Sequence, residues 1–232
     1  NYLRWRFADE SATSGVRKGK EGWLFNNKEN SLDDYMNAMP LSGDDLALML
    51  RNLEKRRAWL KERNIELLVV AAPNKETIYP EFMPDGLPKL QPASRLDQLA
   101  AVLARHPEIN FLDLRAPLLA AKSEARLYHR TDTHWNDYGA FIGAREILTR
   151  LHQTFPAVQP PTIADYCVTK RRNSGGDLAE MLALNHIISE RLVELTPCTP
   201  TQLHSPSRPY SDHDTMPVRD EHVLDKTTPY RT

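Results

Sequence analysis

The stretch Ile65-Glu66-Leu67-Leu68-Val69-Val70-Ala71-Ala72 decides the fold, because it is a nearly continuous apolar run that directly follows a helical pattern. Such a run is typical of a strand buried on both faces of a parallel sheet. It ends at Pro73-Asn74-Lys75, and ligands of open α/β sheets collect at the carboxyl ends of strands. We therefore expect Asn74, Lys75 and, in the next loop, Tyr79 to bind substrate, although Asn and Lys also occur in ordinary turns.

The segments on either side of this strand predict an α/β fold. Apolar residues at helical spacing predict helices over residues 42–64, 95–105 and 115–124, and alternation predicts a strand over 109–114. Helix, strand, helix and strand in succession imply a mostly parallel sheet covered on both sides. We expect residues 65–73 and 109–114 to be neighbouring parallel strands, with the loop after Pro73 at the same edge as the stretch described next.

A second stretch carries chemistry: Arg130-Thr131-Asp132-Thr133-His134-Trp135-Asn136-Asp137-Tyr138-Gly139-Ala140. On extended backbone, residues two apart face the same way, so Asp132 could accept a hydrogen bond from one ring nitrogen of His134 and leave the other free as a base. Asn136 is a good N-cap and Asp137 suits the positive end of a helix dipole. The pattern indicates a catalytic dyad on a loop that is braced by a helix.

Two other interpretations of this stretch stay open. An Asp near a His before a helix is often only capping and surface chemistry. The second interpretation is a metal site, because His129, Asp132, His134 and Asp137 are all possible ligands. The cluster lacks a helical His-x-x-x-His pair and cysteines at zinc-type spacing. We therefore expect no metal and no cofactor.

Composition limits the classes of function. The chain has 232 residues, enough for a real core, and its 30 Lys+Arg against 31 Asp+Glu give a net charge of −1. Such a balanced net charge does not indicate a nucleic-acid partner. The basic stretches Arg17-Lys18-Gly19-Lys20 and Lys170-Arg171-Arg172 could still bind an anionic polymer. Cys167 and Cys198 can form at most one disulfide, and their number alone does not decide the compartment.

The expected organisation is one domain with two appendages. We expect residues 1–20 to form an N-terminal extension and residues 21–196 to form the domain. We expect residues 197–232 to form a polar tail or a connection to a further C-terminal part. No apolar run is long enough to cross a bilayer, and the first residues do not make a signal peptide. Because the sequence begins with Asn1, we expect a segment upstream, where an anchor or signal could lie.

Several blocks in order resemble one family, the alginate O-acetyltransferase AlgX/AlgJ family of SGNH-hydrolase-like proteins. The resemblance covers roughly residues 15–185 and is most specific at Asp-Thr-His-Trp. The blocks are Gly19-Lys20-Glu21-Gly22-Trp23-Leu24-Phe25, Pro73-Asn74-Lys75-Glu76-Thr77-Ile78-Tyr79-Pro80-Glu81, Thr131–Ala140 and Gly176-Asp177-Leu178-Ala179-Glu180-Met181-Leu182.

The resemblance implies an SGNH-like three-layer α/β/α fold, incomplete at the C-terminus, a periplasmic location, and transfer of acetyl groups to hydroxyls of an exported polysaccharide. It implies a membrane-bound acyl-donor protein as a partner, and it matches Asp132 and His134 to the family's catalytic Asp and His. The family's serine lies in a later Asp-Ser-Phe segment, which this sequence does not contain.

Ser174 lies in a flexible turn pattern, so we do not assign it the role of nucleophile, and we expect the chain alone to be inactive. A carbohydrate esterase of the same fold and a non-catalytic polysaccharide-binding module are the alternatives.

Overall fold

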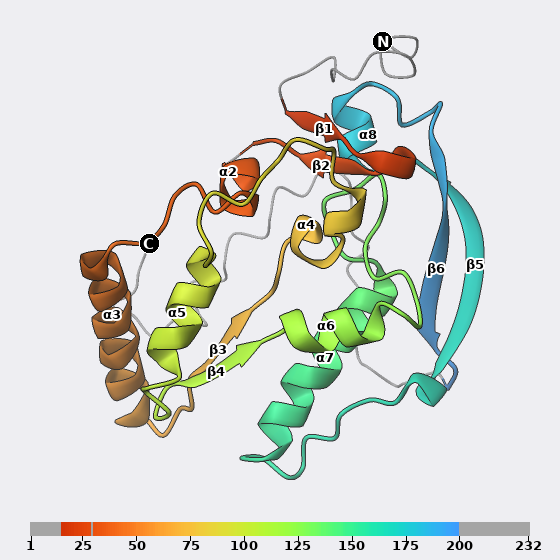
Figure 1. Cartoon of the computed structure of the whole chain (residues 1–232). Helices are drawn as coiled ribbons and strands as arrows, with labels where there is room; N and C mark the ends of the chain where they lie inside the picture. Colours follow the sequence, from red (N-terminus) through yellow and green to blue (C-terminus); the bar gives the residue numbers. More distant parts are fainter. Residues whose placement is uncertain (1–14, 29, 200–232) are drawn as a thin grey trace, which may run out of the picture. The chain divides into compact units, whose positions relative to one another are not determined.

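The computed structural model describes residues 15–28 and 30–199, which belong to one compact unit (Figure 1). Most of the expected tail therefore lies outside the described residues. The elements in chain order are β1 (Val16–Lys18), η1 (Lys20–Gly22), β2 (Leu24–Asn26), α2 (Ser31–Tyr35), α3 (Gly43–Lys61), β3 (Leu68–Ala71), α4 (Lys75–Ile78), η2 (Pro80–Phe82), α5 (Arg95–Leu103), β4 (Asn110–Asp113), α6 (Arg115–Ala121), α7 (Asp137–His152), η3 (Ile163–Asp165), β5 (Tyr166–Ser174), α8 (Asp177–Met181) and β6 (Ser189–Pro197).

The predicted parallel strand pair is confirmed. β3 and β4 pair in parallel, in a register that runs from Leu68 opposite Asn110 to Ala71 opposite Asp113. In the view of Figure 1, α3 and α5 lie to the left of this pair and α6 and α7 to its right, which agrees with the expected α/β class. β3 differs from the prediction in being shorter and only half-buried, because the parallel sheet has two strands in the described part of the chain and each strand has an open edge.

The helix starts follow from local sequence. Ser42 and Asp45 form a reciprocal capping box at the start of α3, and Ser94 and Asp97 form the same arrangement at α5. Each box satisfies backbone N–H groups that have no partner inside the helix. Among the described residues, no helix is long and apolar enough to span a membrane.

The main core cluster joins the segments that lead to the predicted dyad. The Trp23 ring lies 4.6 Å from that of Tyr79 and stacks at 4.7 Å on Phe82, measured between centroids. Leu127 and Tyr128, just before the dyad stretch, are buried in the same cluster. A second cluster packs β1 and β2 against α8 through Val16, Leu24, Leu178, Ala179, Leu182 and Leu184. The dyad stretch therefore starts from a fixed base.

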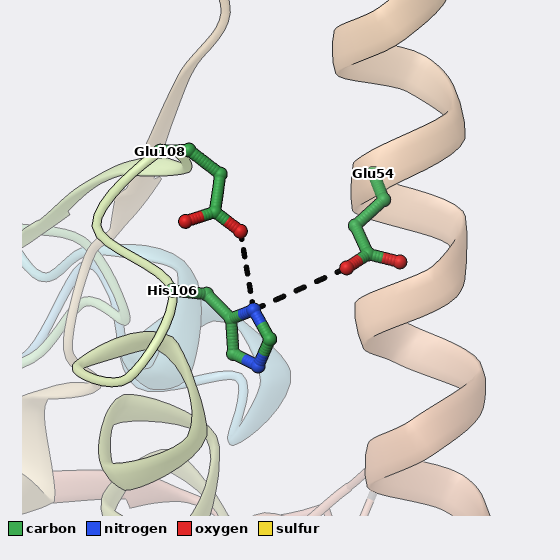
Figure 2. A group of neighbouring side chains, drawn as sticks. All are labelled: Glu54, His106 and Glu108. Carbon is green, nitrogen blue, oxygen red and sulfur yellow. Dashed lines mark hydrogen bonds and ion pairs between the residues drawn. The ribbon is translucent and has the colours of Figure 1, made fainter.

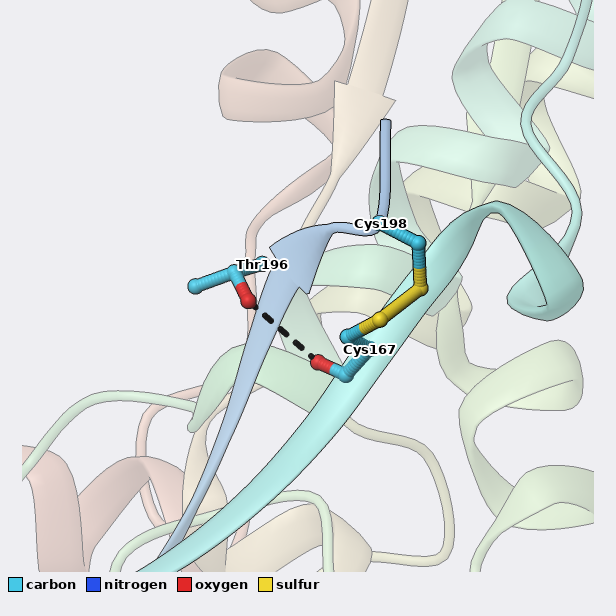
Figure 3. The surroundings of a disulfide bond; sticks show 3 residues. All are labelled: Cys167, Thr196 and Cys198. Carbon is cyan, nitrogen blue, oxygen red and sulfur yellow. Dashed lines mark hydrogen bonds between the residues drawn. A yellow bond between two sulfur atoms is a disulfide. The ribbon is translucent and has the colours of Figure 1, made fainter. Parts of the chain in front are cut away.

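β5 and β6 form a long antiparallel ribbon, a pairing that the sequence did not predict. Nine residue pairs join the strands, from Tyr166 opposite Pro197 to Ser174 opposite Ser189, and most β5 side chains are exposed. Cys167 and Cys198 form a disulfide at one end of the ribbon, beside Thr196 (Figure 3). The other end of β6 reaches the dyad stretch.

Gly139 allows α7 to pack tightly on the chain that precedes the dyad. A Cβ at this position would collide with Leu127 O and lie 2.8 Å from Trp135 Cβ, whereas a Cβ at Gly43 would meet nothing within 4 Å. We predict that Gly139→Ala lowers the free energy of unfolding by about 1–3 kcal/mol through overpacking. Gly43→Ala, as the matched control, should leave it unchanged or raise it by up to about 1 kcal/mol. Urea unfolding of both variants checks this, and equal stabilities would contradict the packing described.

Candidate active site

The structure brings Asp132 and His134 together in the predicted way. Asp132 Oδ1 accepts hydrogen bonds from His134 Nδ1 at 2.7 Å and from the backbone N–H of His134 at 2.9 Å. An ionised carboxylate can only accept, so Nδ1 carries the proton and Nε2 is left free as a base. The His134 side chain is 76% exposed, whereas that of Asp132 is 23% exposed. The catalytic role of the pair stays a prediction that this geometry favours.

Asp177 supports the dyad from α8. Its backbone N–H donates to Asp132 Oδ2 at 3.0 Å, and its carboxylate accepts from the Thr133 N–H at 2.8 Å and from the Thr133 hydroxyl. Burial opposes the ionisation of Asp132, but the N–H groups of His134 and Asp177 and the His134 ring outweigh burial and hold the pKa of Asp132 below its ordinary value. The sequence reasoning missed Asp177 as a site residue, although Gly176-Asp177 before a helix is a recognisable helix start.

The dyad lies on a loop that is closed at its base by backbone bonds. The Asn136 N–H donates to Leu127 O at 2.9 Å, and the His129 N–H donates to His134 O at 3.2 Å. Asn136 Oδ1 accepts from the Gly139 N–H at 3.1 Å, which confirms the predicted N-cap of α7. We call residues 127–136 the dyad loop.

Lys75 reaches the dyad loop from α4. Its ammonium donates to Asp132 O at 2.7 Å and to His129 O at 3.2 Å. This contact confirms that the loop after β3 and the dyad loop share one edge of the parallel pair. Asn74 is exposed at the start of α4 and lies at the same edge. Whether either residue contacts substrate stays a prediction.

Tyr79 lies in the core. It is 4% exposed, and its hydroxyl accepts a hydrogen bond from the Leu127 N–H at 2.9 Å. Burial does not favour its predicted contact with substrate, which stays a prediction.

Two hollows adjoin the carboxyl end of β3. The smaller has a volume of about 270 Å³ and includes Asn74 and Thr133 in its lining. The larger has a volume of about 610 Å³, and Asn74 and Arg95 line it as they line the smaller one. Space for a substrate therefore exists beside the dyad loop, at the strand end where α/β folds bind ligands.

The possible metal ligands that lie together in the structure are not the four that the sequence suggested, because Asp177 takes the place of His129 and Asp137. Ligand atoms of Asp132, His134 and Asp177 lie within 4.8 Å of one another. The carboxylates of Asp132 and Asp177 already accept N–H and O–H groups of the protein on both oxygens. Asp137 instead accepts a hydrogen bond from the Leu195 N–H at 3.0 Å. This arrangement favours a hydrogen-bonded dyad over a metal centre.

A second group of titratable side chains lies away from the dyad loop (Figure 2). His106 Nδ1 is 3.1 Å from a Glu108 carboxylate oxygen and 4.0 Å from one of Glu54 on α3. All three side chains are partly exposed, so surface contacts between α3 and the turn before β4 account for the group.

The ammonium of Lys75 should make stability depend on pH in alkaline solution. Burial lowers the pKa of Lys75 to about 8, while an unfolded lysine titrates near about 10.4. Between these values the folded protein binds fewer protons than the unfolded chain, so the free energy of unfolding rises with pH. The cost of burying the charged Lys75 ammonium therefore lowers the stability in full below pH 8, and this cost is relieved as the pH rises above 8.

We predict that the stability of the wild type relative to Lys75→Met increases by at most about 3 kcal/mol from pH 8 to pH 10.4. Urea unfolding at several pH values measures the difference. A difference that does not change over this range would show that the lysine is solvated in the folded protein.

Comparison with known proteins identifies the family of the chain. Residues 16–215 match the family described as "SGNH hydrolase-like domain, acetyltransferase AlgX". The chain is 32% identical over 181 residues to a probable alginate O-acetylase AlgJ of Pseudomonas syringae pv. tomato, and 30% identical over 184 residues to that of Pseudomonas aeruginosa. Each alignment covers 77% of this chain and 44% of the relative, so the chain spans less than half the length of these relatives.

The fold agrees with a solved member of the family. The chain superposes on Pseudomonas aeruginosa AlgX with a TM-score of 0.52 and 21% sequence identity, over 78% of this chain and 44% of AlgX. This likeness concerns the fold alone. Because the family match covers most of the chain and includes the whole dyad loop, the chain belongs to the SGNH hydrolase-like AlgX acetyltransferase family.

Proposed function

We propose that this chain contributes the Asp-His half of a Ser-His-Asp site that O-acetylates hydroxyl groups of an exported bacterial polysaccharide. The observation that carries the proposal is the 2.7 Å hydrogen bond between Asp132 and His134 Nδ1, in a family member whose imidazole is exposed. The serine is supplied by a part of the protein outside this sequence. Relatives named alginate O-acetylase suggest an alginate-like substrate.

The chemistry is acyl transfer in two steps. His134 Nε2 takes the serine proton while the serine oxygen bonds to the acetyl carbon. The imidazolium then gives this proton to the donor group as the bond between the acetyl group and its donor breaks, which leaves His134 neutral again. In the second step Nε2 takes the proton of a sugar hydroxyl, the sugar oxygen attacks the acetyl-serine, and the serine leaves with a proton from the imidazolium. Asp132 fixes the Nδ1–H tautomer and stabilises the imidazolium in both steps.

The exposure of His134 is consistent with a site whose serine comes from another part of the protein. A general base needs its nucleophile within about 2.6–3.2 Å, so Nε2 must face open space into which a serine can be brought. The supporting groups of Asp132 are already in position before the serine arrives. The fold alone does not choose between a sugar and water as acceptor, so a carbohydrate esterase remains the alternative that the experiment must distinguish.

The proposed setting is the periplasm, with the protein held at the inner membrane by a segment outside this sequence and an acyl-donor protein of the membrane as partner. The Cys167–Cys198 disulfide supports a compartment outside the cytoplasm, because disulfides persist in oxidising environments.

The dyad should control the formation of an acetyl-enzyme. In the protein that contains this domain together with its serine, we predict that Asp132→Asn lowers the rate of acetyl-serine formation on the order of 10⁴-fold, because the imidazole adopts the wrong tautomer. His134→Ala should have a similar effect, and the double variant should be no worse, since residues that act as one unit are not additive. Intact-protein mass spectrometry with an activated acetyl donor measures the adduct.

His186→Ala is the matched control, because His186 is an exposed histidine in the turn after α8. It should form the adduct at the wild-type rate. Acetate release without acetylated sugar would identify an esterase. An adduct that forms normally in His134→Ala, or one on Ser174 of the 232-residue chain, would overturn the proposed mechanism.

A further inference from the structure

Lys75 is a buried charge that the proposed chemistry does not use. It is 2% exposed, and its hydrogen bonds within the described residues all go to backbone carbonyls of the dyad loop: His129, Arg130 at 3.5 Å, and Asp132. An ammonium has three N–H donors, so three carbonyls can use its whole donor capacity. Burying an ammonium is costly. In this protein the buried ammonium holds the backbone carbonyls of the dyad loop in one arrangement.

Glu190 contacts the same loop and carries the opposite charge to Lys75. It comes from the start of β6 and is 7% exposed. Its carboxylate accepts from the Thr131 hydroxyl at 2.6 Å, the Thr131 N–H at 3.3 Å and the Arg130 N–H at 3.0 Å. Arg126 Nη2 lies 3.2 Å from it as a counter-ion. Glu190 therefore binds the amides of a segment whose carbonyls bind Lys75.

The two contacts together orient the peptide planes that precede the dyad. Carbonyls of residues 129, 130 and 132 point to the ammonium, and amides of residues 130 and 131 point to the carboxylate. A rotation of any of these three planes breaks a hydrogen bond to a buried charge, which is costly where the local dielectric constant is low. With the backbone of Asp132 fixed in this way, its Oδ1 stays within reach of His134 Nδ1.

We propose that Lys75 and Glu190 are positioning residues of the dyad, which act through the carbonyl and amide groups of the dyad loop and touch neither the acetyl group nor the sugar. Their effect on catalysis rests on the proposed function. Their effect on the His134 ring does not, and it can be measured in the 232-residue chain without any activity.

The test reads the tautomer of His134 by NMR. The ¹⁵N shifts of the ring nitrogens, assigned with His134→Gln, give the fraction of neutral rings that carry the proton on Nδ1. Asp132→Asn sets the reference for a ring that has lost its partner. We expect Lys75→Met to move the Nδ1–H fraction from the wild-type value toward this reference, and Lys75→Gln, which keeps two N–H donors, to restore much of the difference.

Glu190→Gln tests the opposite side of the loop. The amide keeps one acceptor oxygen but replaces the other with a donor, so either the Arg130 or the Thr131 contact is lost, and the Nδ1–H fraction should fall again. This variant also carries the test if the Lys75 variants do not fold.

Two matched controls separate positioning from general stability. Lys89 donates to the backbone carbonyl of Tyr35, away from the dyad loop, and Glu194 lies on the same strand as Glu190 and pairs with Arg171 at 2.5 Å. Lys89→Met and Glu194→Gln should leave the His134 tautomer at the wild-type value.

The proposal is overturned if folded Lys75→Met and Glu190→Gln proteins keep the wild-type Nδ1–H fraction while Asp132→Asn loses it. In that case the two charges only stabilise the fold. Failure of the longer protein to form acetyl-serine would count against the proposed function and not against this inference, because the ring signal does not depend on turnover.

Discussion

Four backbone N–H groups of one loop donate to carboxylates, and the arrangement of the site depends on these bonds. Those of Arg130 and Thr131 donate to Glu190, that of Thr133 to Asp177, and that of His134 to Asp132. Buried backbone groups must find partners, and hydrogen bonds to ionised acceptors are the stronger kind. These four N–H groups are therefore held by side chains that come from α8, from β6 and from the loop itself.

The imidazole and the side chains that hold its loop differ in their exposure to solvent. The His134 side chain is exposed, whereas Lys75 and Glu190 are buried and Asp132 is partly buried. Electrostatic preorganisation of this kind is a large contribution to catalysis, because the groups need not reorganise during the reaction. The exposed Nε2 leaves room for a nucleophile, and the carboxylates and the buried Lys75 ammonium hold the imidazole in place.

Local sequence predicted those features whose causes are local. The apolar run at residues 65–72, the Asn136 cap and the Asp132/His134 spacing each depend on neighbours a few residues apart, and all three correspond to the observed structure. The pairing of β5 with β6 was missed, because β5 is largely exposed and polar, β6 is only partly buried, and the segment between them includes α8. Glu190 was missed for a related reason: its role arises only when a distant strand reaches the loop, at a separation of 59 residues from Thr131.

The dyad loop is held in place before any nucleophile reaches it. Hydrogen–deuterium exchange of the 232-residue chain, resolved by NMR at single amides, tests this most directly. We expect the N–H groups of Thr131, Thr133 and His134 to exchange slowly, at rates close to those of the amides that join β3 and β4, because opening the loop breaks hydrogen bonds to carboxylates. Exchange of these amides at the rate of unstructured peptides would contradict a preorganised site.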